Sequence, residues 1–477
     1  MHFLDLNKFL PRKVFQALKK AKKTSGVDSV YIVGGAVRDM LLKKIPILDV
    51  DIVVNINACL FSKNLSKILN SHIVYLGKNP TTYRIPFPPP GPAPSNLLRK
   101  GWMNNFCIDV TEYQESIEQD LKRRDFTVDA IAVEFPSCNI IDTTGGLQDI
   151  KKGLLKVPRE DAFLKDPVRI IRLFSIGSSQ CLLIDKKTKI LAKRALNKIK
   201  DIPAERIRQE LLRLFGSKQT YSTMNDMTEM GAWNVLLPES IKLRKIKGGR
   251  FHRLSVWKHS IEALKYFDNL VLSLKGTLKK KIDVYLEKKG WILRFAILIH
   301  DIGKPDTRKY RKGKGYTFYG HESTGEKYCQ IISKRFKLSN DERYLLKMLV
   351  KMHMRAGHLA ELNFPKKGIR RFFKDAGPDI IGLCLVSVSD LGSIKPLQAK
   401  KVLKFLQRVV SGYYDTEKKM IEPFLRGRDI LSMGLKQGPV IGQVLKKIQD
   451  MQIQGKIKTR KHALEWCKKI TAIPFYI

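Results

Sequence analysis

Short apolar runs mark the first part of the chain, and each is bounded by glycine, proline or polar residues. This pattern is typical of strands, and it predicts them over residues 30–33, 49–54, 74–77, 83–86, 106–110 and 139–142. An amphipathic helix over 8–21 leads towards the first strand, and a short helix over 36–42 follows it. Together these elements predict an α/β unit of roughly 150 residues.

From about residue 160 onward the apolar positions recur almost only at helical spacing. Helices are expected over 204–215 and within 163–174, where Pro167 lies near the first helical turn and Asp166 is a plausible cap; each carries basic residues on one side. The chain is long enough for two to four domains, each with its own core. The pattern therefore predicts an α+β protein, with a sheet-containing first unit and a helical remainder.

The charge of the chain is strongly positive. Lys and Arg number 89 against 45 Asp and Glu, which gives a formal net charge of +44. Such a field attracts polyanions in a salt-dependent way, so nucleic acid is the first candidate partner. A generally lysine-rich composition is the alternative, and the charge alone does not separate the two.

Seven cysteines are scattered without any C-x-x-C spacing, which indicates neither a zinc cluster nor a disulfide framework. The N-terminus lacks the apolar core of a signal peptide, and no apolar run approaches the ~20 residues that a membrane-spanning helix needs. We expect a cytoplasmic protein with no membrane partner.

A glycine pair followed by two aspartates is the first candidate site. Gly34 and Gly35 precede a short helix, where phosphates could approach the backbone. Asp49 and Asp51 share one face of the next strand, and two such carboxylates can hold Mg²⁺ together with substrate phosphates. Asp109 on a later strand could be a third carboxylate. The pattern suggests metal-dependent nucleotidyl transfer, although a D-x-D pair at a solvated strand end is common.

Two further groups of charged residues follow. Arg124 and Asp125 belong to an Arg-Arg-Asp step, and an arginine offers a planar fork for phosphate or ribose. Arg169 and Arg172 lie on one side of the expected helix over 163–174. A surface ion pair and a solvated basic face are the alternatives for these two groups.

The second half of the chain contains a separate set of histidines and aspartates. His300 and Asp301 are adjacent at the end of an apolar helix, and neighbouring helices could supply His259 and Asp390. Such a group can bind a divalent cation and so lower the pKa of coordinated water, which favours phosphoester hydrolysis. Two more candidates for the same pocket rank below these four, namely His321 and His353.

These motifs together resemble the class II CCA tRNA nucleotidyltransferase and poly(A) polymerase family. The G-G-x-V-R-D…D-x-D signature is matched by Gly34, Gly35, Arg38, Asp39, Asp49 and Asp51, and the R-R-D-F-T block by residues 123–127. Asp166 and Arg169 stand at the family's E-D-x-x-R motif, while the H…HD…D order resembles HD-superfamily phosphohydrolases. The combination is similar to the HD-containing branch of the family.

The resemblance implies a polymerase-β-like head with a mixed sheet, followed by a mostly helical neck, body and tail. The expected domains are a catalytic head over 1–155, an RNA- and base-binding neck over 156–245, an HD domain over 246–415 and a helical tail over 416–477. It also implies that Arg124 and Asp125 orient the sugar, and that Asp166 and Arg169 read the base of CTP or ATP.

The function implied is template-independent addition of all or part of CCA to the 3′ end of tRNA, with Mg²⁺ on the head and a second divalent metal in the HD domain. Poly(A) polymerase shares every head motif and remains the alternative. An HD phosphohydrolase with an inactive head is an alternative from another class, and a non-catalytic tRNA-binding protein is a third. Three departures put base selectivity in doubt: Lys165 replaces an acid, Asp129 replaces Asn, and a second Arg after Arg172 is missing.

Overall fold

The computed structural model describes residues 3–77, 81–87, 106–217, 220–247, 254–392, 394–413, 415, 422–435 and 437–471. The chain divides into two compact units, Met1–Ile202 and Pro203–Ile477. The division falls inside the expected neck, and the four-domain organisation remains a prediction. Among the described residues, no helix has both the length and the apolar character needed to cross a membrane.

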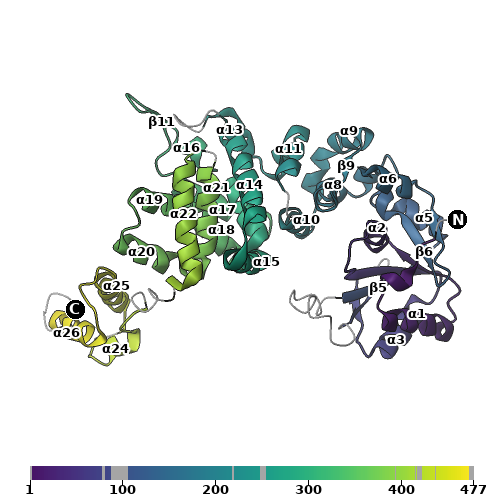
Figure 1. Ribbon diagram of the computed structural model, residues 1–477, viewed down its shortest axis with the longest axis horizontal. Coiled ribbons are helices and arrows are strands. Elements are labelled where there is room, and N and C mark those ends of the chain that lie inside the picture. Colours follow the sequence, from purple (N-terminus) through teal and green to yellow (C-terminus); the bar gives the residue numbers. More distant parts are fainter. Residues whose placement is uncertain are drawn as a thin grey trace. The chain divides into compact units, whose positions relative to one another are not determined.

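A mixed sheet forms the centre of the first unit (Figure 1). Its strand order is β3-β4-β5-β2-β1-β6-β7, in which β2 and β5 run parallel and the other neighbours run antiparallel. The strands are β1 (Val30–Val33), β2 (Asp49–Val54), β3 (Val74–Leu76), β4 (Thr82–Phe87), β5 (Phe106–Glu112), β6 (Ile131–Phe135) and β7 (Ile140–Asp142). All six expected strands are therefore confirmed, and β6 lies in the stretch whose structure the pattern left open.

Helices cover this sheet and continue the chain beyond it. They are α1 (Arg12–Ser25), α2 (Gly35–Leu41), α3 (Ala58–Leu69), α5 (Ile117–Arg123), α6 (Gly146–Lys152), α7 (Ala162–Lys165), α8 (Val168–Gln180) and α9 (Lys186–Arg194). Helices α1 and α3 pack together and bury their apolar faces in the main core of the sheet. The first helix begins at Arg12 and not at residue 8, because proline disfavours helical dihedrals at the residue before it and Pro11 itself caps the helix in an extended conformation.

The second unit is helical. Its helices are α10 (Ala204–Gly216), α11 (Tyr221–Met230), α12 (Ala232–Leu236), α13 (Ser240–Lys245), α14 (Val256–Ser273), α15 (Gly276–Ile299), α16 (Lys304–Thr307), α17 (His321–Arg335), α18 (Asn340–Met352), α19 (Arg355–Glu361), α20 (Lys366–Ala376), α21 (Ile380–Gly392), α22 (Pro396–Arg408), α24 (Gly427–Leu431), α25 (Pro439–Ile453) and α26 (Arg460–Thr471). A small hairpin of β10 (Lys309–Arg311) and β11 (Gly315–Thr317) interrupts them. The expected α+β fold, a mixed-sheet head followed by helices, is confirmed.

Helix α15 organises the larger helical bundle. Its last ten residues, Gly290–Ile299, are buried on all sides because α14, α18 and α21 pack around them. A helix that is apolar all round is expected only where neighbours surround it. The helix ends directly before His300 and Asp301, so these two polar side chains are delivered into the interior of the bundle. Helices α24, α25 and α26 share a separate small core around Ile430, Ile448 and Cys467.

Candidate active site and histidine cluster

Three aspartates lie close together on the two parallel strands of the head. Asp49 and Asp51 alternate with buried residues along β2, and Asp51 lies directly opposite Asp109 on β5. The third carboxylate is already paired, because Arg84 on β4 donates to both oxygens of Asp109 at 2.8 and 2.7 Å. Sequence reasoning did not find Arg84, since only the pairing of β4 with β5 brings it to Asp109.

The carboxylate of Asp51 is in an unfavourable electrostatic environment. Burial raises its pKa to about 6; Arg124 opposes this rise, and the charges of Asp109 and Asp49 add to it. A cation between the carboxylates of Asp49 and Asp51 would relieve both the burial and the repulsion. Two carboxylates on one strand face are a donor set that suits a hard divalent ion such as Mg²⁺.

Gly34 makes room for this arrangement. Its backbone has a φ of +75° and a ψ of −147°, a combination that essentially only glycine adopts. A Cβ atom at this position would lie 2.7 Å from Oδ2 of Asp51 and 2.9 Å from Nη1 of Arg124. The absent side chain is therefore what allows Asp51 and Arg124 to meet beside the start of α2. At Gly35 an added Cβ would lie 3.3 Å from the guanidinium of Arg38, a tighter approach than most Cβ atoms make.

Arg38 is a buried link within the head, with 8% of its surface exposed. Its Nη1 donates to Asp129 at 2.6 Å and its Nε donates to Asp39 at 2.8 Å. This contact explains why an aspartate at position 129 is tolerated, since the buried carboxylate faces a guanidinium. The expected role of Arg38 in binding nucleotide remains a prediction.

The Arg-Arg-Asp step joins the head sheet to α8. Nε of Arg169 lies 2.7 Å from one oxygen of Asp125, Arg172 donates to the other, and Nη2 of Arg169 donates to the carbonyl of Arg123 at 2.8 Å. Asp125 therefore holds two of the arginines that the sequence suggested for nucleotide binding.

The charged residues beside this step contact partners that are close to them in sequence. Arg124 is oriented by Asp120, one helical turn earlier, which accepts from its Nε and Nη2 at 3.2 and 3.1 Å. Sequence reasoning missed Asp120, although its spacing of four residues from Arg124 on a helix is a usable signal. Asp166 ends α7, and its carbonyl accepts from the backbone N–H of Arg169. Lys165, which replaces an acid of the family motif, forms an ion pair with Asp161 at 3.1 Å.

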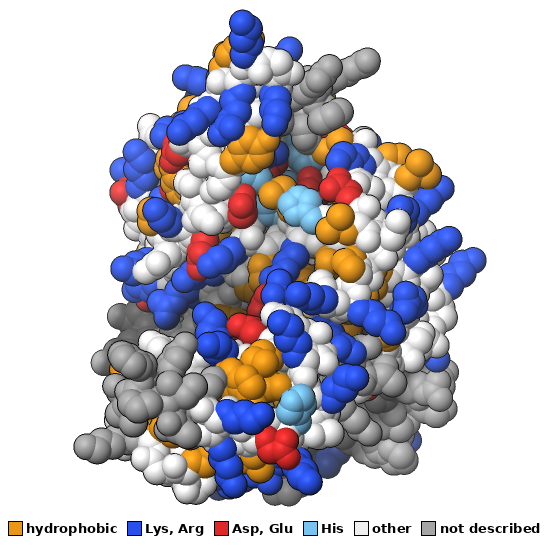
Figure 2. All heavy atoms as spheres, turned by 90° about the vertical axis from the view of Figure 1, so that its left-hand side faces the viewer, with side chains coloured by type: hydrophobic (Ala, Val, Ile, Leu, Met, Phe, Trp, Pro, Cys, Tyr) orange, Lys and Arg blue, Asp and Glu red, His pale blue; other side chains and the backbone are white. Residues whose placement is uncertain are grey.

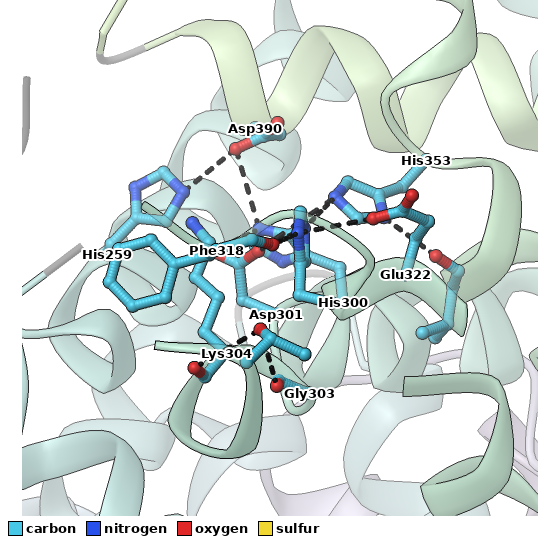
Figure 3. A network of polar contacts seen from close by, with 12 residues as sticks. His259, His300, Asp301, Gly303, Lys304, Phe318, Glu322, His353 and Asp390 are labelled. Atoms are coloured by element: carbon cyan, nitrogen blue, oxygen red, sulfur yellow. Dashed lines mark hydrogen bonds and ion pairs between the residues drawn. The ribbon is translucent and has the colours of Figure 1, made fainter. Parts of the chain in front are cut away.

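In the helical unit, six histidine and aspartate side chains converge from five helix regions (Figure 3). Asp390 accepts from Nε2 of His259 at 2.9 Å, and Nε2 of His300 lies 3.4 Å from the same oxygen. Asp301 lies between the other histidines, with its oxygens 3.3 Å from His300, 3.3 Å from His321 and 3.9 Å from His353. The structure thus brings together all four principal candidates and both of the lower-ranked ones.

Three of the histidines are held in the same way. The Nδ1 atoms of His300, His321 and His353 lie 2.7–2.9 Å from the carbonyl oxygens three residues earlier. Each Nδ1 therefore carries the proton, which leaves Nε2 as the coordinating atom in the neutral tautomer. Nε2 of His300 is buried and has no hydrogen-bond partner. These six side chains fit a divalent cation, and their number suffices for two.

Buried positive charge already compensates the carboxylates of the cluster, and a bound divalent cation would have to take its place. Burial lowers the pKa of His300, but the carboxylates of Asp301 and Asp390 outweigh burial and raise it to about 10. Burial and the positive charge of His300 lower the pKa of His353 to about 3. Lys304, which sequence reasoning did not assign, donates to Asp301 at 2.5 Å and supplies a further buried positive charge.

A pocket of about 200 Å³ opens onto the cluster. It is lined by Asp301, Lys304, His353, Met354, Gly357, His358, Glu361, Ser387, Asp390, Leu391, Ile394 and Lys395. Figure 2 shows a hollow with histidine side chains in it, bordered by acidic and hydrophobic side chains, with Lys and Arg farther out. A small phosphate-bearing group could therefore reach the cluster from solvent.

Comparison with known families assigns the head. Residues 30–156 match the poly A polymerase head domain, and residues 182–243 match a probable RNA and SrmB- binding site of polymerase A. The A-adding tRNA nucleotidyltransferase of Deinococcus radiodurans is 28% identical over 373 residues, which cover 74% of this chain and 80% of that protein. The chain is therefore similar to tRNA nucleotidyltransferases over most of its length. The CC-adding tRNA nucleotidyltransferase of Thermus thermophilus is 26% identical over 370 residues, 75% of this chain and 78% of the relative.

Solved structures of CCA-adding enzymes share the fold of this chain. The Thermotoga maritima CCA-adding enzyme complexed with tRNA aligns with a TM-score of 0.58 at 20% identity, covering 99% of this chain and all of that one. A CCA-adding enzyme in complex with CTP aligns with a TM-score of 0.62 at 20% identity, covering 99% of both chains.

Proposed function

We propose that this protein adds all or part of the CCA sequence to the 3′ end of tRNA, using CTP and ATP. The observation that carries the proposal is the linkage of Asp51, Arg124, Asp125 and α8 in one head unit. The two relatives described above are named as A-adding and CC-adding tRNA nucleotidyltransferases, and each aligns with about three quarters of the chain. Action on tRNA is also consistent with the net charge of +44, and it would place the protein in the cytoplasm.

In the reaction, the 3′-hydroxyl of the RNA attacks the α-phosphate of the nucleotide and pyrophosphate leaves. Asp49 and Asp51 would hold Mg²⁺, which when bound neutralises charge on the triphosphate and favours loss of the hydroxyl proton. Arg124 lies beside Asp51 and, held by Asp120, can contribute a fixed positive charge to the nucleotide.

Base selection would depend on Asp166 and Arg169. A guanidinium donates two parallel hydrogen bonds and a carboxylate accepts from an exocyclic amine, so this pair can read the edge shared by C and A. Arg169 is held by Asp125. Nucleotide binding would therefore have to share or replace that contact, which couples sugar recognition at Asp125 to base recognition at Arg169.

Nucleotide incorporation tests this proposal directly. The protein is incubated with Mg²⁺ and each labelled nucleotide, once with tRNA lacking CCA and once with unstructured RNA. Incorporation of C, of A, or of both on tRNA alone supports the proposal and shows which part of CCA is added. Long A tails on both RNAs without C incorporation would instead identify a poly(A) polymerase. An Asp51→Asn variant should incorporate nothing in either assay.

The histidine cluster favours a second candidate function, metal-dependent phosphoester hydrolysis. The close grouping of histidines with Asp301 and Asp390, three of whose members line one pocket (Asp301, His353 and Asp390), supports it. A divalent cation bound there would lower the pKa of coordinated water. Asp301→Asn should abolish hydrolysis of a phosphate monoester while leaving nucleotide incorporation intact, and Asp51→Asn should do the reverse. Loss of both activities in both variants would contradict two separate sites.

A further inference from the structure

The hairpin of β10 and β11 carries an unusual concentration of positive charge. Between Arg308 and Tyr319 the chain has five Lys and Arg residues and no Asp or Glu. All five are exposed, and the hairpin projects away from the neighbouring helices (Figure 1). In Figure 2, Lys and Arg side chains gather at the top of the view, above the hollow that contains histidine side chains. The hairpin is therefore a basic projection of the helical unit.

Aromatic residues alternate with these basic residues along the hairpin, and the strand register determines which face of the hairpin each group occupies. Tyr310 and Tyr316 are cross-strand partners, so both rings lie on one face of the ribbon. Their centroids are 5.5 Å apart, and the two residues are 70% and 48% exposed. The guanidinium of Arg308 lies 3.7 Å from the centroid of Tyr316, while Lys309 and Arg311 occupy the alternate positions. One face of the ribbon thus presents π-surfaces, and the other presents cations.

The aromatic face also borders a groove. The groove has a volume of about 470 Å³ and is lined by Lys245, Lys247, Arg308, Gly313, Lys314, Gly315 and Tyr316. Four of these residues are cationic and none is acidic. Its size is within the range of sites that enclose small ligands. Its lining suits a phosphate-bearing group beside an aromatic ring.

The hairpin leads directly into the histidine cluster. Phe318 follows β11, and its carbonyl oxygen accepts from Nδ1 of His321 at 2.9 Å. Nζ of Lys304 lies 5.7 Å from the centroid of the Phe318 ring, and both residues border the cluster in Figure 3. The base of the hairpin therefore lies beside the candidate metal-binding side chains.

We propose that the β10–β11 hairpin binds a single-stranded segment of RNA, which stacks bases on Tyr310 and Tyr316 and continues towards the histidine cluster. Exposed aromatic rings among cations are the arrangement that holds single strands, because every base has a face that can stack. An acidic peptide would use the charges without needing two rings on which bases stack, and binding to an anionic membrane is an outcome of the test below. Duplex RNA hides its base faces within the helix. The inference rests on the proposed function only in taking RNA as the substrate.

Binding of a fluorescent single-stranded oligoribonucleotide to the full chain, without nucleotide, tests the proposal. Replacing both tyrosines by alanine should weaken binding by about tenfold or more, whereas replacing both by phenylalanine should preserve it. Replacing Lys309 and Lys312 by alanine should reduce the slope of log affinity against log salt by up to about 1.4. Tyr344→Ala provides a matched control, since this tyrosine is 65% exposed beside basic residues of α18.

Three results would overturn the proposal. The first is unchanged binding by the double alanine variant, and the second is an equal loss with Tyr344→Ala. The third is binding of duplex RNA or of anionic vesicles that depends on the two tyrosines as strongly as single-strand binding does. Incorporation of C and A is measured on the same preparations. A wild-type protein that incorporates nothing but binds RNA through the tyrosines contradicts the nucleotidyltransferase proposal and leaves the hairpin proposal standing.

Discussion

The close approach of Asp51 and Arg124 at Gly34 gives a sharp prediction for the variant Gly34→Ala. Ordinary contact with a Cβ atom begins at 3.4 Å, and the added carbon would lie 2.7 Å from the carboxylate oxygen. The carboxylate must therefore move by about 0.7 Å. Because misplacing a reacting group by ~1 Å can cost 10²-fold in rate, we expect nucleotide incorporation to fall on the order of 10- to 100-fold.

A second effect of the substitution must be separated from the first. Alanine is also strained at the backbone conformation of Gly34, which costs roughly 1–3 kcal/mol of stability. Gly377 provides the matched control, because its φ of +53° and ψ of −135° lie in a similar region and an added Cβ would meet no atom within 4 Å. Gly377→Ala should show a comparable backbone cost and keep its activity.

The assay is the initial rate of nucleotide incorporation on tRNA lacking CCA, with circular dichroism and thermal unfolding recorded for each variant. A folded Gly34→Ala protein that works at the wild-type rate would refute the steric argument. An equal loss of activity in Gly377→Ala would show that backbone strain, and not the displacement of Asp51, is responsible.

Three further predictions follow from the electrostatics. Nucleotide incorporation should fall as the pH is lowered through about 6. Burial raises the pKa of Asp51 to about 6, and protonation of this carboxylate removes a metal ligand. A rate of incorporation that does not change between pH 5 and pH 7 would contradict this. Removal of divalent metal by a chelator should stop nucleotide incorporation, and added Mg²⁺ should restore it. If the two metal sites are independent, Mg²⁺ should restore incorporation equally well in the His353→Ala variant. Asp268→Ala should destabilise the helical unit by roughly 3–5 kcal/mol, because it leaves the buried guanidinium of Arg294 unpaired. Asp283→Ala, which removes an exposed ion pair, should change the unfolding free energy by less than about 1 kcal/mol.

Local patterns in the sequence were enough to predict the strands of the head, the change to helices and the family motifs. A strand alternates with a period of two and a buried helix is apolar all round, so β2 and the end of α15 could be recognised without any partner. The same patterns predicted that Asp49 and Asp51 share a face and that His300 and Asp301 end an apolar helix. These features depend on neighbours in sequence.

Contacts between distant segments were decided only by the tertiary structure. Arg38 pairs with Asp129 across 91 positions and Arg84 with Asp109 across 25, and nothing in the local pattern of either residue indicates its partner. The histidines, likewise, lie on separate helices. They form one cluster only because α14, α18 and α21 pack around α15 and α17 packs against α18. The sequence determined which chemical groups were available, and the packing of the sheet and helices determined which of them meet. The physical reason is that a buried charged group has lost its contact with water, so the residues that the fold places beside it must stabilise it.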